Sequence, residues 1–96
     1  MKKMIKTQKY IEKQLHLDRY SNGQLAVFVT GYLREPIAEL SIRNDLVELA
    51  PNEFILKDYS ENQVIADNFF EKGFIKSTNR FILVGSRFCP ICQIGS

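Results

Sequence analysis

Cys89-Pro90-Ile91-Cys92 is the motif of this chain whose residue types and spacing best suit chemistry. Two cysteines three positions apart could act as a redox pair, which needs the first thiol at the start of a helix. Only four residues follow Cys92, so we expect no helix there. The same spacing could provide half of a zinc site, completed by His16 and a carboxylate or by a second copy of the chain. In a third interpretation, which we favour, both cysteines are small buried residues of a terminal strand and bind no metal.

Other groups that could perform acid–base or nucleophilic chemistry are isolated in the sequence. His16, the one histidine, stands between two leucines with no serine or cysteine at a spacing that indicates a triad. Asp58 and Glu61 flank Ser60, where helix capping and the helix dipole explain both carboxylates. The five glycines are scattered and form no phosphate loop. The sequence therefore predicts that the protein is not an enzyme and uses no cofactor.

One well-defined helix is expected between Ser60 and Gly73. Ser60 is a favoured N-cap, and Gln63 stands three residues later, which together indicate a capping box. Gly73 can adopt the left-handed conformation that ends a helix. The spacing also predicts one hydrophobic contact at each end of the helix: Tyr59 with Val64, and Phe74 with Phe69.

Asn22-Gly23 predicts a β-hairpin with a two-residue type I′ turn, which needs positive φ at both central residues. With this turn Leu17 lies opposite Phe28. One face then carries Leu15, Leu17, Ala26, Phe28 and Thr30, and the other carries His16, Tyr20, Leu25, Val27 and Val29. The second strand, 25–29, is apolar on both sides, which predicts a central position in the sheet.

Further strands are expected at 37–43, 54–57, 80–84 and 87–94, with a polar turn at 77–79. Pro90 lacks a backbone N–H, so the last strand should be an edge strand or irregular. These elements predict one α+β domain over residues 1–96. We expect an antiparallel sheet of five to six strands, including the N-terminal hairpin, with one principal helix packed on it.

The composition, 45% hydrophobic and 25% charged with a net charge of +2, is that of an ordinary folded protein. No apolar run approaches the roughly 18 residues that cross a membrane, and two cysteines make no disulfide framework. We therefore expect a cytoplasmic protein with no membrane partner. Residues 1–9 hold four lysines and no acid, which indicates a basic arm that contacts phosphate or a solubilising tail. A short N-terminal helix is also compatible with the apolar spacing of this segment.

Tyrosine and arginine side chains on the hairpin side are the candidates for binding a partner, because both types are enriched at interface hot spots. The candidates are Tyr10, Arg19, Tyr20, Tyr32, Arg34 and Arg43. With the basic arm they could also contact nucleic acid, although Glu12, Asp18, Glu35 and Glu39 dilute the positive field. The sequence favours a protein partner, keeps nucleic acid as an alternative, and allows a homodimer through an exposed terminal strand.

Several turn and cap motifs resemble one family. They are Tyr20-Ser-Asn-Gly-Gln-Leu-Ala26, Glu35-Pro-Ile-Ala-Glu-Leu-Ser-Ile42, and Leu49-Ala-Pro-Asn-Glu53 leading into Asp58-Tyr-Ser-Glu-Asn62. They are similar to a family of small uncharacterised bacterial proteins, many from gut species, often encoded on plasmids, prophages and conjugative elements. The resemblance implies an accessory protein of a mobile element or phage and transfers no functional residues.

Mobile elements commonly encode inhibitors of host defence, so the resemblance also implies an alternative function as an anti-CRISPR-like inhibitor of a host nuclease. Our primary expectation is a small non-enzymatic interaction module that acts by binding another protein.

Overall fold

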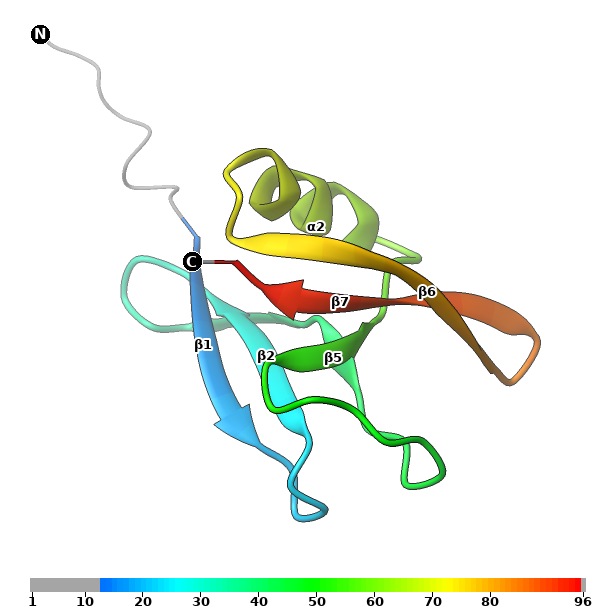
Figure 1. Ribbon diagram of the computed structural model, residues 1–96. Coiled ribbons are helices and arrows are strands. Elements are labelled where there is room, and N and C mark those ends of the chain that lie inside the picture. Colours follow the sequence, from blue (N-terminus) through cyan, green and yellow to red (C-terminus); the bar gives the residue numbers. More distant parts are fainter. Residues whose placement is uncertain (1–12, 96) are drawn as a thin grey trace, which may run out of the picture.

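The computed structural model describes residues 13–95, so Tyr10 and the expected N-terminal arm or helix lie outside the described residues. Within the described part, the elements are β1 (Gln14–Arg19), β2 (Leu25–Thr30), β3 (Pro36–Glu39), β4 (Ser41–Ile42), β5 (Glu53–Leu56), α2 (Asn62–Glu71), β6 (Ile75–Val84) and β7 (Arg87–Ile94). They form two antiparallel sheets, ordered β1-β2-β3 and β4-β5-β7-β6, with α2 beside β6 (Figure 1). The α+β prediction is confirmed, with two sheets in place of the single one expected.

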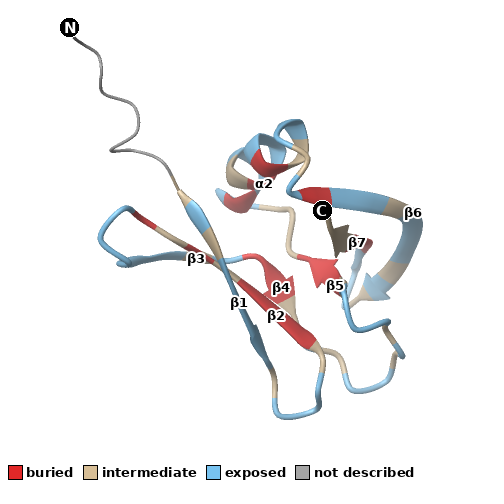
Figure 2. Ribbon diagram, turned by 60° about the vertical axis from the view of Figure 1, so that its left-hand side comes forward, coloured by how far each residue is buried: buried red, intermediate tan, exposed pale blue. Residues whose placement is uncertain are grey.

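The main core lies where the two sheets and the helix meet. It includes Val27 and Val29 of β2, Phe54 and Leu56 of β5, and Phe69 of α2, all almost completely buried. Figure 2 shows the buried residues along β2, β4 and β5, the strands that line this meeting point. A smaller cluster occupies the other face of the four-stranded sheet and contains Ile55, Cys89 and Ile91, with Val47 and Leu49 packed against it.

The β1–β2 hairpin has a three-residue connection, so the predicted two-residue type I′ turn was wrong. Tyr20 N donates to Gln24 O at 2.9 Å, Gly23 N donates to Tyr20 O at 2.9 Å, and within the turn only Gly23 has positive φ. Asn22 Oδ1 accepts a hydrogen bond from Gln24 N at 3.0 Å, which stabilises this longer connection. The extra residue shifts the register by one position.

The shift exchanges the predicted faces of β1, because neighbouring side chains of a strand point to opposite sides. Leu15 lies opposite Val29 and packs against the main core, and Leu17 lies opposite Val27 on the same face but is 46% exposed. His16 lies opposite Phe28 instead. The central position of β2 was predicted correctly.

The strand expected at 37–43 is divided at Leu40 into β3 and β4. Leu40 is fully buried; its N–H donates to Val27 O at 2.8 Å, and its carbonyl accepts from Lys57 N at 2.7 Å. Its amide therefore bonds the three-stranded sheet and its carbonyl bonds the segment that follows β5. Leu40 is the residue at which the chain passes from one sheet to the other.

The start of α2 also differs from the prediction. The helix begins at Asn62 with Glu61 as N-cap and no side-chain capping bond, while Ser60 has a φ of 59° and cannot form the predicted capping box. Asn62 is buried instead, and its Nδ2 donates to Glu39 O at 3.0 Å, which ties the helix start to β3. Val64 is exposed, so the predicted hydrophobic staple was wrong.

The end of α2 follows the prediction closely. Gly73 has a φ of 78°, its N–H donates to Phe70 O at 3.0 Å, and Phe74 N donates to Phe69 O at 2.9 Å. These two bonds are those of a Schellman motif. The rings of Phe69 and Phe74 lie 6.0 Å apart between centroids, so the predicted contact is confirmed.

The last strand, β7, lies between β5 and β6, so the predicted edge position was wrong. Ile91 O accepts a hydrogen bond from Thr78 Oγ1 of β6 at 2.6 Å. Neighbouring residues turn their backbone groups to opposite sides, so the nitrogen of Pro90 points away from β6. On that side the β5 ladder has already ended at Ile55 and Ile91, and the missing N–H interrupts no pairing.

Among residues 13–95, β6 is the outer strand on this side of the sheet. The turn predicted at 77–79 is a bulge inside this ten-residue strand, where Asn79 has a φ of 64°. Because β7 is an inner strand, the predicted homodimer route through an exposed terminal strand was wrong.

Among the described residues, no helix has the length and apolar character needed to span a membrane.

Candidate functional site

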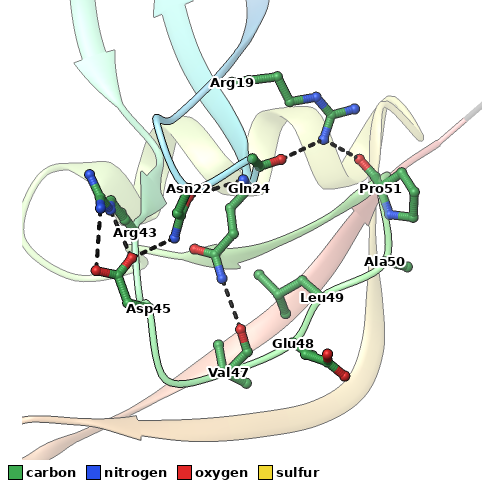
Figure 3. Close-up of a pocket in the computed structure, with 11 residues that line it drawn as sticks. Arg19, Asn22, Gln24, Arg43, Asp45, Val47, Glu48, Leu49, Ala50 and Pro51 are labelled. Atoms are coloured by element: carbon green, nitrogen blue, oxygen red, sulfur yellow. Dashed lines mark hydrogen bonds and ion pairs between the residues drawn. The ribbon is translucent and has the colours of Figure 1, made fainter.

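The predicted binding residues fall at opposite ends of the three-stranded sheet. Arg19 and Arg43 line a hollow of about 690 Å³ between the β1–β2 connection and the loop after β4 (Figure 3). Tyr32 and Arg34 lie in the connection that follows the far end of β2. The predicted set therefore does not form one continuous surface, and Tyr10 lies outside the described residues.

In the hollow, Arg43 is engaged within the chain. Its Nε donates to Asp45 Oδ1 at 2.9 Å, its Nη2 to Oδ2 at 3.2 Å, and its Nη1 to Ser21 Oγ at 2.7 Å. The hydrogen-bonded ion pair raises the pKa of Arg43 and, together with a bond from Asn22, lowers that of Asp45. The charge of Arg43 is therefore balanced by Asp45, and its guanidinium binds other parts of the chain.

Arg19 forms no ion pair with a carboxylate among residues 13–95; its Nη1 donates to Pro51 O at 2.8 Å and to Gly23 O at 3.4 Å. Gln24 fastens the same loop through Nε2, which donates to Asn44 O at 2.7 Å and Val47 O at 3.0 Å. The polar groups of the hollow thus hold the loop at 43–52 against the hairpin. Few polar groups of the hollow therefore remain to bind a ligand.

Tyr20 is also occupied inside the fold. Its hydroxyl donates to Glu39 Oε2 and shares a 2.7 Å hydrogen bond with Ser41 Oγ, which in turn accepts from Val27 N at 2.8 Å. Burial, followed by the bond to Glu39, raises the pKa of Tyr20 to about 12. This network joins Tyr20, which follows β1, to β2, the end of β3 and the start of β4. The Tyr20 hydroxyl is therefore used inside the fold rather than for contact with a partner.

The two cysteines lie on opposite faces of the four-stranded sheet. Cys89 packs with Ile55 and Ile91, whereas Cys92 belongs to the main core between the sheets. Burial raises the pKa of Cys92 to about 12 and also raises that of Cys89. Both thiols are therefore protonated at neutral pH and are poor nucleophiles and metal ligands.

His16 is far from this pair in the architecture, because it lies on β1 opposite Phe28, with ring centroids 6.4 Å apart. The three weak metal candidates are consequently not brought together. Within residues 13–95 no group of three or more histidine, cysteine or carboxylate side chains is placed to hold a metal ion.

The surface that sequence reasoning missed lies on the β6–β7 hairpin. Phe81 and Leu83 of β6 are 60% and 54% exposed, and Phe88 of β7 is 71% exposed. Leu83 lies opposite Phe88, and Phe81 lies opposite Pro90, so all three exposed side chains share one face. We call Phe81, Leu83 and Phe88 the hairpin patch. In Figure 1 the turn end of this hairpin (orange) extends past the other strands, and Figure 2 shows β6 exposed along most of its length.

The other face of the same hairpin carries basic residues on either side of Ile82 and Val84, which pack against the smaller cluster. Lys76, Arg80 and Arg87 lie opposite Gln93, Ile91 and Val84, on the side away from the hairpin patch. Arg80 forms an ion pair with Glu53, and the guanidinium carbon of Arg87 lies 4.3 Å from the ring centroid of Tyr59. From residue 72 onward the sequence has four basic residues and no acidic one. The hairpin therefore has an exposed apolar face and an opposite face on which basic residues flank a partly buried apolar stretch.

A signal for the hairpin patch was present in the sequence. Phe81-Ile82-Leu83-Val84 is a run of four apolar residues, and only alternate members of a strand can point into one core. The three-stranded sheet and α2 determine which of these four residues are covered, because their extent over β6 decides it. Local sequence patterns do not predict that extent.

No family model, curated protein or solved structure matches this chain.

Proposed function

We propose that this protein is a small non-enzymatic interaction module that binds another protein through the hairpin patch. The observation that carries this proposal is the position of two phenylalanines and a leucine, all more than half exposed, side by side on one face. Contiguous apolar surface of this kind is typical of sites that bind proteins, whereas single exposed apolar residues are common on any surface.

The energetics also favour an occupant. Complete burial of side chains of this size is worth roughly 1.5–3 kcal/mol each. Folding leaves more than half of each side chain in water, so a partner could gain several kcal/mol from the hairpin patch before the cost of association. Aromatic residues are also the type most enriched at interface hot spots.

Nucleic acid is a weaker candidate partner because the bases and the phosphates would need different faces of the hairpin. Single-stranded nucleic acid stacks its bases on aromatic rings while cations beside those rings contact its backbone. Here Phe81 and Phe88 share one face, and Arg80 and Arg87 occupy the other. Of the cations predicted for this role, Arg43 is neutralised by Asp45.

The biological setting that we propose is a bacterial mobile element or phage, on the basis of the resemblance of the turn and cap motifs. A partner within a host defence nuclease is the alternative function in that setting. Recovery of a CRISPR effector with the tagged protein, dependent on the hairpin patch, would select this alternative over other protein partners.

The proposal is tested by recovering partners from host cells with two tagged triple variants. The first replaces the hairpin patch: Phe81→Ser, Leu83→Ser and Phe88→Ser. The matched control replaces three exposed apolar residues elsewhere: Leu33→Ser, Leu46→Ser and Val64→Ser. We expect the wild type and the control to recover the same protein and the hairpin-patch variant to lose it. Equal recovery by both variants would overturn the proposal.

A further inference from the structure

We propose that the face of the three-stranded sheet that points away from the main core binds an organic anion, in which a carboxylate is attached to an aromatic or branched apolar group. This site is separate from the hairpin patch and does not depend on the function proposed for that patch. Three observations support it: two adjoining hollows, an arginine held in a conformation that favours glycine, and the engagement of the nearby acids within the chain.

Residues of β1 and β2 place polar side chains on this face. Gln14 lies opposite Thr30, and His16 lies opposite Phe28. Opposite residues of an antiparallel pair point to the same side of the sheet, so these four share one face. Their neighbour Val29 is buried in the main core, so the four side chains are on the side turned away from it. We call this side the outer face.

Two adjoining hollows lie on the outer face. The second hollow, of about 410 Å³, is lined mainly by apolar residues, among them Phe28, Pro36 and Ile37. His16 and Thr30 line both hollows, so the two are continuous. Each has the size of a small-molecule site, in which apolar walls are combined with a few polar groups. The first hollow, of about 430 Å³, is lined by Gln14, Leu15, His16, Thr30 and Arg34.

The polar groups of the first hollow suit a carboxylate. Arg34 forms no ion pair with an acid among residues 13–95, and a guanidinium can donate two parallel hydrogen bonds to a carboxylate. Gln14 and Thr30 add amide and hydroxyl donors, and His16 adds a ring N–H. The side-chain hydrogen bonds within the described part of the chain use none of these four side chains.

The backbone holds Arg34 in a conformation that favours glycine. Arg34 has a φ of 67°, and its N–H donates to Gly31 O at 3.0 Å. Gly31 N donates to Glu35 O at 2.9 Å and closes the same connection. A left-handed φ is unfavourable for a residue with a Cβ, and such strained positions cluster at ligand-binding sites. A ligand held by the Arg34 side chain would explain why arginine occupies this position.

The acidic residues near the hollows are engaged within the chain. Glu35 lines neither hollow, and its Oε1 accepts a hydrogen bond from Leu33 N at 2.9 Å. Glu39 lines the second hollow but not the first, and its carboxylate accepts a hydrogen bond from the Tyr20 hydroxyl. Among residues 13–95, the first hollow is therefore lined by a cation and by no acid, which complements an anion. The second hollow accommodates the apolar part of the ligand.

The experiment uses the full-length protein and two probes. N-acetylphenylalanine joins a carboxylate to an aromatic ring, and its amide lacks the charge. We expect the acid to bind at least about tenfold more tightly than the amide in a titration followed by backbone amide chemical shifts. The shift changes should map to His16, Phe28 and Thr30. Equal affinity for the two probes, or shift changes confined to the β6–β7 hairpin, would overturn the inference.

Arg34→Gly separates binding from folding. Glycine accepts the left-handed φ, so this variant should unfold at a higher urea concentration than the wild type while binding the acid at least about tenfold more weakly. Arg19→Gln is the matched control, because Arg19 also has no ion pair among the described residues but lines the hollow at the other end of the sheet. It should bind the acid as the wild type does. Unchanged binding by Arg34→Gly, or an equal loss in Arg19→Gln, would contradict the site.

Ile37→Ser tests the apolar part of the site. Ile37 is 40% exposed, so the substitution is compatible with folding. We expect the wild type to bind N-acetylphenylalanine at least about fivefold more tightly than N-acetylglycine, and Ile37→Ser to reduce this preference. The same preference in both proteins would show that the second hollow does not hold the ligand.

A free aromatic acid and the end of a peptide chain carry the same chemistry. Free 3-phenylpropionate and a peptide that ends in phenylalanine distinguish the two sources. Tighter binding of the peptide would identify a chain terminus as the ligand, and equal or tighter binding of 3-phenylpropionate would identify a small molecule. Failure of both to bind at the outer face would overturn the inference and leave the function proposed for the hairpin patch unaffected.

Discussion

Leu83 lies directly opposite Phe88 across the β6–β7 hairpin, and more than half of each side chain is exposed to water. A cross-strand apolar pair stabilises a sheet when the surrounding core covers it. Here the main core and α2 cover other parts of the four-stranded sheet, and the pair contributes little to folding. Its exposure is what the proposed binding of a partner at the hairpin patch would require.

The first prediction concerns the stability of the hairpin patch. Phe81→Ser and Phe88→Ser should each change the free energy of unfolding by no more than about 0.5 kcal/mol, because exposed substitutions outside special features have small effects. Urea denaturation measures this change. Phe54→Ala in the buried core provides the contrast and should cost about 3–5 kcal/mol. A comparable loss from Phe81→Ser would mean that the hairpin patch belongs to the core.

The second prediction concerns the hydroxyl of Tyr20. Tyr20→Phe removes its hydrogen bonds to Glu39 and Ser41 and should reduce the free energy of unfolding by about 1–2 kcal/mol. Tyr32→Phe is the matched control, since Tyr32 is exposed and should tolerate the change within about 0.3 kcal/mol. Equal stability of the two variants would show that the Tyr20 network does not contribute.

The third prediction follows from the raised pKa of Tyr20. The folded-state pKa of about 12 exceeds the ordinary value of 10.0, so folding favours the protonated phenol. This contribution to stability is complete below pH 10 and is lost as the pH rises from 10 to about 12. Tyr20→Phe should therefore show a smaller loss of stability over that range than the wild type. Parallel pH curves for the two proteins would contradict the assignment.

The fourth prediction concerns the thiols. Because Cys89 and Cys92 are buried with raised pKa values, a disulfide reagent should label both at pH 8 at least about a hundredfold more slowly in the native protein than in urea. Cys92, in the main core, should be the slower of the two. Rapid labelling of both thiols without denaturant would argue against their burial.

The fifth prediction separates the observed helix start from the capping box expected from the sequence. Ser60→Gly should raise the free energy of unfolding by up to about 1 kcal/mol, because glycine accepts the left-handed φ of this position without strain. Asn62→Ala should lower it by about 1–2 kcal/mol through loss of the bond to Glu39 O. If Ser60 were the N-cap, glycine would instead cost a few tenths of a kcal/mol.

Local signals in the sequence predicted the parts of the fold that depend on local chemistry. Gly73 ends the helix as expected because only the conformation of one residue decides it. Asn22-Gly23 predicted a hairpin but not its register, since the same pair suits two- and three-residue connections and one extra residue exchanges the faces of β1. The apolar pattern at 37–43 could not reveal that the amide and carbonyl of Leu40 bond different sheets.

The candidate site was harder to predict than the fold. Hot-spot statistics selected tyrosines and arginines, but Tyr20 and Arg43 use their polar groups inside the chain. The sequence did not predict the hairpin patch, because four consecutive apolar residues from Phe81 to Val84 are typical of a buried strand. Its exposure depends on β6 being an outer strand, and therefore on β7 lying inside the sheet despite Pro90.

The central claim is that the hairpin patch is where the protein meets its partner, and site-specific photo-crosslinking in host cells tests it most directly. A photoreactive amino acid would replace Leu83 in one strain and Leu46, an almost fully exposed residue of the 43–52 loop, in another. We predict a discrete protein adduct from position 83 and none from position 46. The same adduct from both positions, or an adduct from position 46 alone, would contradict the claim.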